Sequence, residues 1–289
     1  MVSFWHQILS GIATGGIYAS LALALVMIYQ STHHVNFAQG EMATFSTFIA
    51  YTLVTAGVPY WAAFLITVAV SFVLGVGIER VLLRPVAGAP ELTMVGVFIG
   101  LLLIFNALSG WIWDYTIKPF PSPFGDRALF GGVISSHELG TIAVTLAVLV
   151  LIYVFFRHTR LGLAMRAVAY NPASSRLVGI RVGWMLALGW GLAAAIGAVA
   201  GMMIAPIVFL DPNMMGGILL YAFAGALLGG LDSPLGAVIG GFLVGVIENL
   251  GGAYVVGTEL KLTLALIIIA GVLVVKPSGL LGRAVAGRV

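Results

Sequence analysis

The sequence predicts an all-α protein, a polytopic transmembrane bundle of about eight spans (8–9). Three observations support this fold class. Charged residues make up 8% of the 289 residues, against about 25% in soluble domains. Hydrophobic residues make up 61%, and the mean hydropathy is +1.13. Uncharged stretches long enough to cross a bilayer recur along the chain. Such a composition excludes a soluble enzyme, a disordered protein and a nucleic-acid binder.

Four spans are expected in the first half of the chain. The first covers residues 8–29, and the fourth covers 92–113. Residues 42–78 are uncharged but contain Gly57-Val58-Pro59, a turn signal, so two spans are expected there. The first Lys or Arg is Arg80, so the N-terminal stretch is expected to be a retained span rather than a signal peptide.

The second half continues with spans over 139–156, 182–210 and about 260–275. Between the last two lie two short glycine-rich pieces, within 216–250, separated by Leu231-Asp232-Ser233-Pro234. These pieces form either two short spans or a hairpin that enters and leaves on one side. Both arrangements give no net crossing. No segment between spans is long enough for a soluble domain, so residues 1–289 are expected to form one transmembrane domain.

The distribution of Lys and Arg predicts the orientation, because cytoplasmic loops carry an excess of both. With the N-terminus outside and the C-terminus in the cytoplasm, ten of the 13 basic residues lie inside. They are Arg80, Arg84, Arg157, Arg160, Arg166, Arg176, Arg181, Lys276, Arg283 and Arg288. Lys118, Arg127 and Lys261 then lie outside.

Motifs for catalysis or cofactors are not visible. None of the three lysines follows a glycine, so the phosphate-binding pattern G-x-x-x-x-G-K-[ST] is absent and this chain is not expected to use ATP by that route. The adjacent His33 and His34 make a poor metal pair. No catalytic residue, metal site or cofactor is therefore expected.

Polar residues interrupt the apolar sequence at VNFAQGE (35–41). One interpretation is a broken-helix element that lines a translocation path, where exposed backbone is tolerated. The other is a short cytoplasmic loop with Glu41 near the N-terminus of the next helix. The sequence does not decide between them.

The loop 157–183 has its own predicted structure. Residues 160–170 are compatible with a helix, and Asn171-Pro172 stops it. Asn171 is positioned to cap a second helix over 173–178, with Pro172 at its first position and Gly179 at its end. A loop that only fixes topology and touches anionic lipid needs none of these features. A docking element for a cytoplasmic partner is the favoured interpretation.

The densest glycine tract is 228–245, with two G-x-x-x-G spacings that permit close helix contact. Helix packing is expected at Gly229, Gly230, Gly236, Gly240, Gly241 and Gly245. Asp232 and Glu248 need a separate explanation, because a carboxylate inside a span is costly and is usually functional or paired. Asp232 suits a surface turn beside Ser233, and Glu248 lies close enough to a span end to reach water.

Five separated stretches, in order, resemble the inner-membrane permease subunits of branched-chain amino acid ABC transporters, and the shorter of the two subunits above all. They are GIYASLALAL (16–25), VNFAQGE (35–41), GLAMRAVAYNP (162–172), LVGI (177–180) and GGLDSPLGAVIGG (229–241). Gln39 and Tyr170 depart from the family pattern, in which His and Gln are expected. The resemblance covers nearly the whole chain.

The resemblance implies a transport subunit rather than an enzyme, in the bacterial inner membrane. Its expected partners are a second permease, two cytoplasmic ATPase subunits and a periplasmic binding protein. The translocation path is expected to include Asn36, Gln39, Glu41 and Asn106. Coupling to the ATPase is expected at Arg160, Arg166, Asn171, Pro172 and Arg176. The alternatives are a permease of this family for urea, short amides or aromatic acids, a solitary ion-coupled transporter, and a membrane enzyme.

Overall fold

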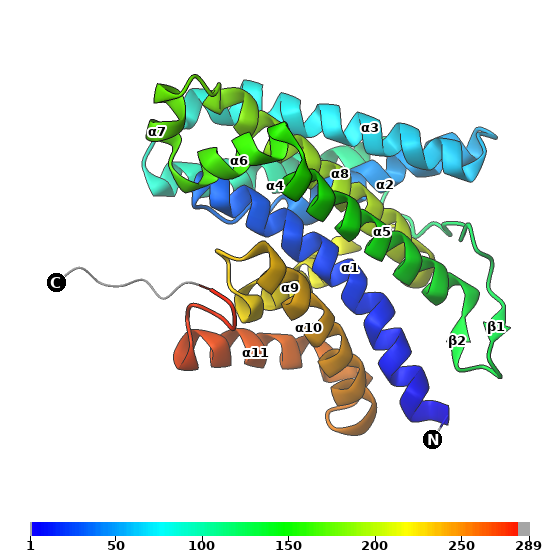
Figure 1. The fold of residues 1–289 in the computed structure, drawn as a ribbon. Helices are drawn as coiled ribbons and strands as arrows, with labels where there is room; N and C mark the ends of the chain where they lie inside the picture. Colours follow the sequence, from blue (N-terminus) through cyan, green and yellow to red (C-terminus); the bar gives the residue numbers. More distant parts are fainter. Residues whose placement is uncertain (1, 283–289) are drawn as a thin grey trace. The chain divides into compact units, whose positions relative to one another are not determined.

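The computed structural model describes residues 2–282, which are almost entirely helical (Figure 1). The helices are α1 Val2–Thr32, α2 Gln39–Thr55, α3 Tyr60–Ile78, α4 Glu91–Trp113, α5 Ser136–His158, α6 Arg160–Tyr170, α7 Pro172–Leu177, α8 Val182–Val208, α9 Met215–Gly229, α10 Pro234–Tyr254 and α11 Lys261–Val275. A short π-helix, Glu79–Leu83, and a 3-10 turn, Arg84–Val86, extend α3, and another 3-10 turn, Thr258–Leu260, precedes α11. The strands β1 Ala128–Leu129 and β2 Ile134–Ser135 pair in an antiparallel hairpin.

Seven of the helical segments in residues 2–282 are long and apolar enough to cross a membrane. The predicted fold class is therefore confirmed, and the expected count of about eight is close. Two helices in the regions of expected spans are shorter than the seven. α2 has 17 residues, and α9 has 15. The second glycine-rich piece, by contrast, forms α10, whose 21 residues reach the length of a full span.

The predicted turns and caps lie where the sequence indicated them. Gly57 has φ = 90° between α2 and α3. Asn171 Oδ1 accepts a hydrogen bond from Ser174 N at 2.9 Å, with Pro172 as the first residue of α7. Ser233 Oγ accepts from Gly236 N at 3.0 Å and so caps α10, beside an exposed Asp232. In each case a local hydrogen bond or a glycine sets the bend.

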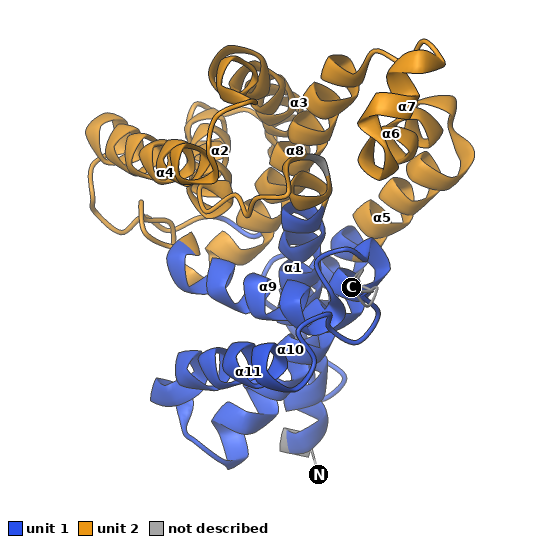
Figure 2. Ribbon diagram, turned by 90° about the vertical axis from the view of Figure 1, so that its left-hand side faces the viewer, with its two compact units in different colours: residues 1–26, 121–145, 216–289 blue, residues 27–120, 146–215 orange. Residues whose placement is uncertain are grey.

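The chain divides into two compact units, coloured separately in Figure 2. Unit 1 comprises Met1–Val26, Pro121–Thr145 and Gly216–Val289. Its centre is built on glycine contacts between helices. A Cβ atom at Gly15 would lie 3.0 Å from the Cα atom of Phe242, and one at Gly225 would lie 2.7 Å from the Cα atom of Gly241. Only hydrogen atoms fit between these backbones, so α10 packs closely on both α1 and α9.

The six glycines predicted for packing all belong to unit 1. Gly229 faces Gly236, Gly240 faces Gly225, Gly241 faces Ala19, and Gly245 faces Gly15. Gly230 differs, because it follows α9 with φ = 111° and lies against Ser278 and Gly282. Five of the six therefore lie in helices at close approaches, and the sixth makes a turn that residues with a Cβ atom rarely adopt.

Unit 2 comprises Met27–Phe120 and Leu146–Met215. Here α8 packs against α2, α3 and α6. The fully buried Trp190 of α8 stacks on Phe98 of α4, with ring centroids 6.0 Å apart. Two further contacts tie segment ends together. The Arg80 guanidinium lies 3.7 Å from the ring centroid of Trp184, and Lys118 and Leu210 form a two-bond antiparallel bridge.

Candidate functional site

Unit 2 contains two chain breaks with unusual backbone conformations. The first separates α1 from α2 and contains His33, with φ = 56°. The second separates α8 from α9 and begins at Phe209, with φ = 65° and ψ = 155°. Residues other than glycine rarely adopt such angles, which cost about 1–3 kcal/mol and are found mostly where function requires them.

The first break lies beside the middle of α8. Gln39 Nε2 donates a hydrogen bond to Ala193 O at 2.9 Å, and Ala193 is the twelfth of the 27 residues of α8. Asn36 Oδ1 accepts from Ala38 N at 3.0 Å, and Asn36 Nδ2 donates to Gln39 Oε1 at 3.4 Å. Both side chains are fully buried. Asn36 therefore satisfies backbone of the break, Gln39 ties the start of α2 to the backbone of α8, and neither faces an open surface.

Glu41 and Asn106, the other two residues predicted for a path, meet at a second set of contacts. Asn106 Nδ2 lies 3.3 Å from Glu41 Oε2, 3.1 Å from Pro212 O and 2.9 Å from Asn213 Oδ1. Tyr115 Oη donates to Asn106 Oδ1 at 3.5 Å. The amide of one α4 side chain thus joins the first turn of α2 to the chain break after α8.

Solvent exposure increases across this cluster, from a buried carboxylate to an exposed amide. Glu41 is 7% exposed, Asn106 is half-buried and Asn213 is exposed. Around it, α4 presents exposed apolar side chains such as Leu103 and Ile104. Polar groups at this depth are costly against lipid, so they belong beside water or another protein.

Three residues of this cluster were not predicted: Asp211, Pro212 and Asn213. Asn213 N donates to Asp211 Oδ1 at 2.7 Å, which holds the turn after Phe209. The sequence does contain a signal, since Asp-Pro-Asn directly follows a long apolar span. Nothing in the sequence, however, indicates that this turn lies beside Asn106, about 100 residues earlier.

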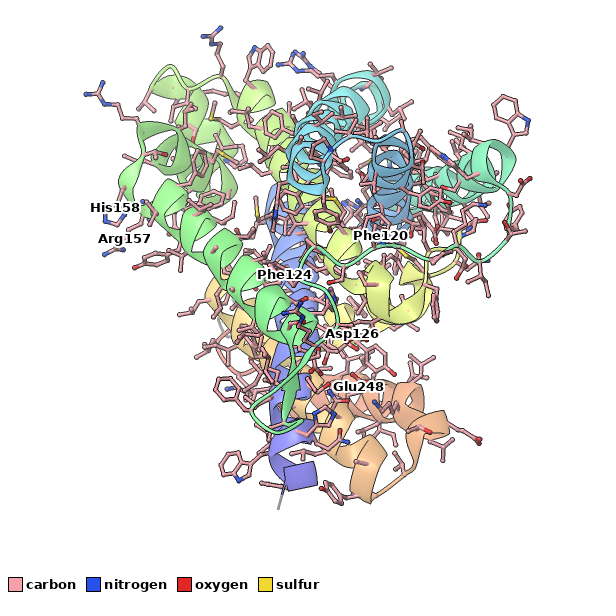
Figure 3. The ribbon with its side chains drawn as sticks, turned by 90° about the vertical axis from the view of Figure 1, so that its right-hand side faces the viewer. Phe120, Phe124, Asp126, Arg157, His158 and Glu248 are labelled. Carbon is pink, nitrogen blue, oxygen red and sulfur yellow. The ribbon has the colours of Figure 1, made fainter. Side chains whose placement is uncertain are left out.

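The residues predicted for coupling lie on α6 and α7. Arg160, Arg166, Asn171, Pro172 and Arg176 are all exposed. Thr159 caps α6 by accepting from Gly162 N at 2.9 Å. The face of α6 that carries Gly162, Met165 and Val168 is buried, and α6 packs on α8. Arg157 and His158 extend outward from the end of α5 (Figure 3). One face of α6 is therefore packed against α8. Its basic face is exposed in the part of the chain that the structure describes.

The same segment also exposes apolar side chains. Leu161, Leu163, Tyr170, Leu177 and Val178 are exposed, the last two at 89% and 76%. Arginine and aromatic residues are enriched at protein interfaces, and this segment exposes three arginines and Tyr170.

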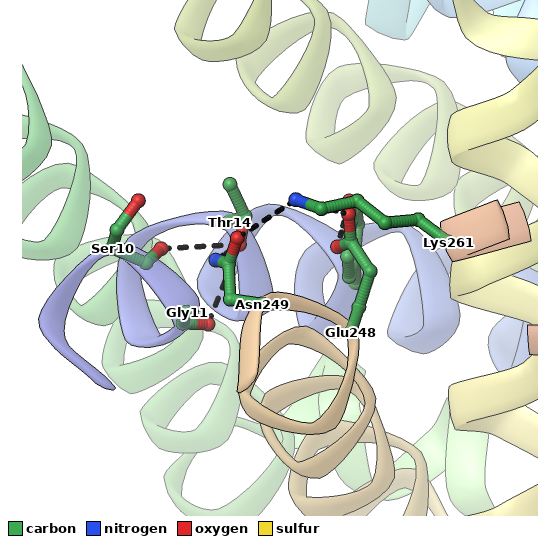
Figure 4. Close-up of polar contacts among 7 residues, drawn as sticks. Ser10, Gly11, Thr14, Glu248, Asn249 and Lys261 are labelled. Carbon is green, nitrogen blue, oxygen red and sulfur yellow. Dashed lines mark hydrogen bonds and ion pairs between the residues drawn. The ribbon is translucent and has the colours of Figure 1, made fainter. Parts of the chain in front are cut away.

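A buried ion pair lies in unit 1 (Figure 4). Lys261 Nζ is 3.3 Å from Glu248 Oε1, and Tyr18 Oη donates to Glu248 Oε2 at 2.8 Å. Lys261 Nζ also donates to Asn249 Oδ1 at 3.0 Å, and Asn249 Nδ2 donates to Thr14 Oγ1 at 3.3 Å. Glu248, 7% exposed, is thus paired rather than reaching water. Pairing offsets the cost of a carboxylate inside a span.

Metal-binding geometry is not found in residues 2–282, which contain no group of three or more His, Asp or Glu side chains placed to hold an ion. His33 and His34 lie at the end of α1, where His34 Nδ1 is 2.5 Å from Thr32 O. The candidate functional sites are therefore the polar and ionic contacts between apolar helices.

Apolar helices with polar breaks between them define this chain as a membrane transport component, and comparison with known proteins agrees. Residues 7–274 match the family described as branched-chain amino acid transport system / permease component. The chain belongs to this family, as its resemblance predicted. It is a multi-pass membrane protein and a permease subunit of a transport system.

Curated relatives resemble the chain over nearly its whole length. The high-affinity branched-chain amino acid transport system permease protein BraD of Pseudomonas aeruginosa is 32% identical, covering 97% of this chain and 96% of that protein. LivH of Escherichia coli K12, described in the same words, is 30% identical with the same coverage. A probable branched-chain amino acid permease LivH of Methanocaldococcus jannaschii is 29% identical over 91% of this chain and 87% of that protein.

Proposed function

We propose that this chain is one permease subunit of an ATP-driven importer that moves branched-chain amino acids into the cytoplasm. The similarity to BraD over 97% of the chain is the observation that carries this proposal. The importer is completed by a second permease, two cytoplasmic ATPase subunits and a periplasmic binding protein. It lies in the inner membrane, and hydrolysis of ATP takes place in the partner subunits.

The translocation path in this proposal runs past the break before α2. Glu41 and Asn106 provide its polar surface, and Asn36 and Gln39 hold the broken backbone behind them. Discontinuous helices near the middle of the membrane are the usual setting of substrate sites in transporters. The position of Gln39 beside the middle of α8 supports this assignment.

The α6–α7 segment is the proposed docking element for an ATPase subunit. Arg160, Arg166 and Arg176 supply positive charge, and Asn171-Pro172 supplies the rigid turn between the helices. Burial of Met165 and Val168 transmits movement of this segment to α8. The exposed arginines beside exposed apolar side chains support docking over a purely topological role.

Charge reversal at the docking segment is expected to uncouple the transporter. In the Arg166→Glu, Arg176→Glu variant, co-purification of the ATPase and ATP-dependent uptake of radiolabelled leucine into proteoliposomes should both fall at least tenfold. Like charges placed across an interface cost several kcal/mol, by order of magnitude. Lys118→Glu with Arg127→Glu is the matched control and should leave both measurements unchanged. Normal ATPase yield from the α6–α7 variant would refute the docking assignment.

The proposed orientation has the N-terminus outside and the C-terminus in the cytoplasm. Two contacts inside unit 2 support this orientation. Arg80, assigned to the cytoplasmic side, contacts Trp184 at the start of α8, and Lys118, assigned to the outside, pairs with Leu210 after the end of α8. The native chain contains no cysteine, so single cysteines report cleanly.

A cysteine at Asp126, in the exposed segment before α5, is expected to react with an impermeant maleimide added to intact cells. A cysteine at Ser174, exposed on α7, should react only after the cells are opened. Gel-shift labelling measures both. The opposite pattern would reverse the orientation.

A further inference from the structure

The oxygen atoms around Asn106 outnumber the protons available to them. The Asn106 amide nitrogen carries two hydrogen atoms, yet Glu41 Oε2, Pro212 O and Asn213 Oδ1 all lie within 3.3 Å of it. At least one of these acceptors therefore lacks a full hydrogen bond from this nitrogen. The cluster is rich in acceptors and poor in donors.

The same three oxygens converge on one point. Their distances of 2.9, 3.1 and 3.3 Å to a single nitrogen match N–H···O hydrogen bonds. They are longer than the roughly 2.3–2.6 Å that a bare Ca²⁺ ion takes to oxygen. A primary ammonium group, with three N–H donors on one nitrogen, fits both the number and the spacing of these acceptors.

The charge of the cluster also favours a cation. Among the described residues, no Lys or Arg lies within ion-pair distance of Glu41 or Asp211. Asp211, whose Oδ1 accepts a hydrogen bond from Asn213 N, adds a second carboxylate to the turn that carries Pro212 and Asn213. A carboxylate that is 93% buried without a positive partner is costly, and an ammonium group removes that cost.

Two further polar atoms extend the cluster along its helices. Thr44 lies three residues beyond Glu41 on α2, and Ser109 lies three residues beyond Asn106 on α4, so each shares a helical face with its neighbour. Both side chains are fully buried, and neither hydroxyl has a hydrogen-bond partner in residues 2–282. Buried polar groups without partners are rare, and both hydroxyls keep the capacity to hydrogen-bond a further group.

We propose that Glu41, Asn213 and the carbonyl of Pro212 receive the α-ammonium group of the transported amino acid when the Asn106 amide swings aside. This inference rests on the proposed function and specifies which end of the solute this chain recognises. Asn213 is exposed, so one of the proposed acceptors lies at the surface of the chain. The solute's carboxylate and side chain are recognised elsewhere.

The test uses a single cysteine at Tyr115, which is 59% exposed and makes only the longest contact in the cluster. In the complete importer in proteoliposomes, the rate of maleimide labelling is measured with leucine, with isopentylamine, which lacks the carboxylate, and with 4-methylpentanoate, which lacks the ammonium group. Sodium chloride at the same concentration controls for simple cations. Leucine and isopentylamine should slow labelling at least threefold, and the other two should not.

Substitution at Glu41 then assigns the effect to this site. In the Glu41→Gln background protection by leucine and isopentylamine should disappear, whereas the exposed Glu91→Gln control should retain it. A second reporter cysteine at Thr116, exposed beside Tyr115 and outside the proposed site, repeats the measurement, in case one variant does not assemble. A cysteine at Asp126 should show no protection.

The proposal is overturned by protection that persists in Glu41→Gln, by protection from 4-methylpentanoate or sodium alone, or by no protection while leucine uptake is intact. Absence of ATP-dependent leucine uptake by the unmodified importer would instead refute the proposed function. Protection by isopentylamine in that case would still establish the ammonium site. The two failures are therefore distinguishable.

Discussion

The Gly240→Ala variant is expected to lose most of its folded protein. The added Cβ atom would overlap the carbonyl oxygen of Gly225 and lie 2.8 Å from the backbone nitrogen of Gly229. Both neighbours are backbone atoms of α9, so no side chain can move away to make room. Overpacking usually costs about 1–3 kcal/mol, and this site belongs at the upper end because α9 and α10 must separate.

The measurement is the thermal unfolding midpoint of the purified subunit in detergent, together with its yield in the membrane. Gly96→Ala is the matched control, since Gly96 also lies in the interior of a helix and an added Cβ there has nothing within 4 Å. Its midpoint should stay the same or rise slightly, because alanine favours helix over glycine. Equal midpoints for the two variants would show that the α9–α10 contact is not tight.

The second large effect is expected at the buried ion pair. Lys261→Met leaves Glu248 with only the Tyr18 hydroxyl in its buried setting. Removing one partner of a fully buried pair typically costs about 3–5 kcal/mol, because the remaining charge has no compensation. The Lys261 side chain is 25% exposed, so the loss here should fall at or below the lower end of that range. Glu248→Gln should also destabilise the subunit, by leaving the Lys261 ammonium group unpaired.

The double variant Glu248→Gln, Lys261→Met should recover most of the lost stability, because it contains no unpaired charge. A double-mutant cycle on unfolding midpoints measures this recovery, and we expect a coupling energy of about 2 kcal/mol or more. Lys276→Met, at an exposed lysine after α11, is the control and should change little. Strictly additive effects of the two substitutions would mean that the pair is not formed in the membrane.

Local features of the fold were predictable from the sequence. The fourth span, expected over 92–113, is observed as Glu91–Trp113, and the capped turn at Asn171-Pro172 forms as expected. Such features depend on hydropathy and on hydrogen bonds between near neighbours. The first span is longer than expected, because α1 also includes residues 2–7 and continues to Thr32, and no charged residue interrupts it at either end.

Contacts between distant segments were not predictable in the same way. Glu248 was expected near a span end, yet its partner Lys261 lies beyond a turn and on another helix. The depth of the break at 33–38 depends on the contact between Gln39 and Ala193, 154 residues apart. Hydropathy describes each segment alone, so it is silent about which polar residues from different segments meet.

The side-chain amide of Asn106 occupies the position that we propose for the ammonium group. Its nitrogen lies within 3.3 Å of all three acceptor oxygens. An ammonium group that binds there must displace the Asn106 amide nitrogen. The net binding free energy is therefore only the difference between two similar sets of hydrogen bonds. The affinity of this cluster for the ammonium group of the solute is therefore expected to be low. Weak binding suits a translocation path, because the solute has to leave each position as readily as it enters it.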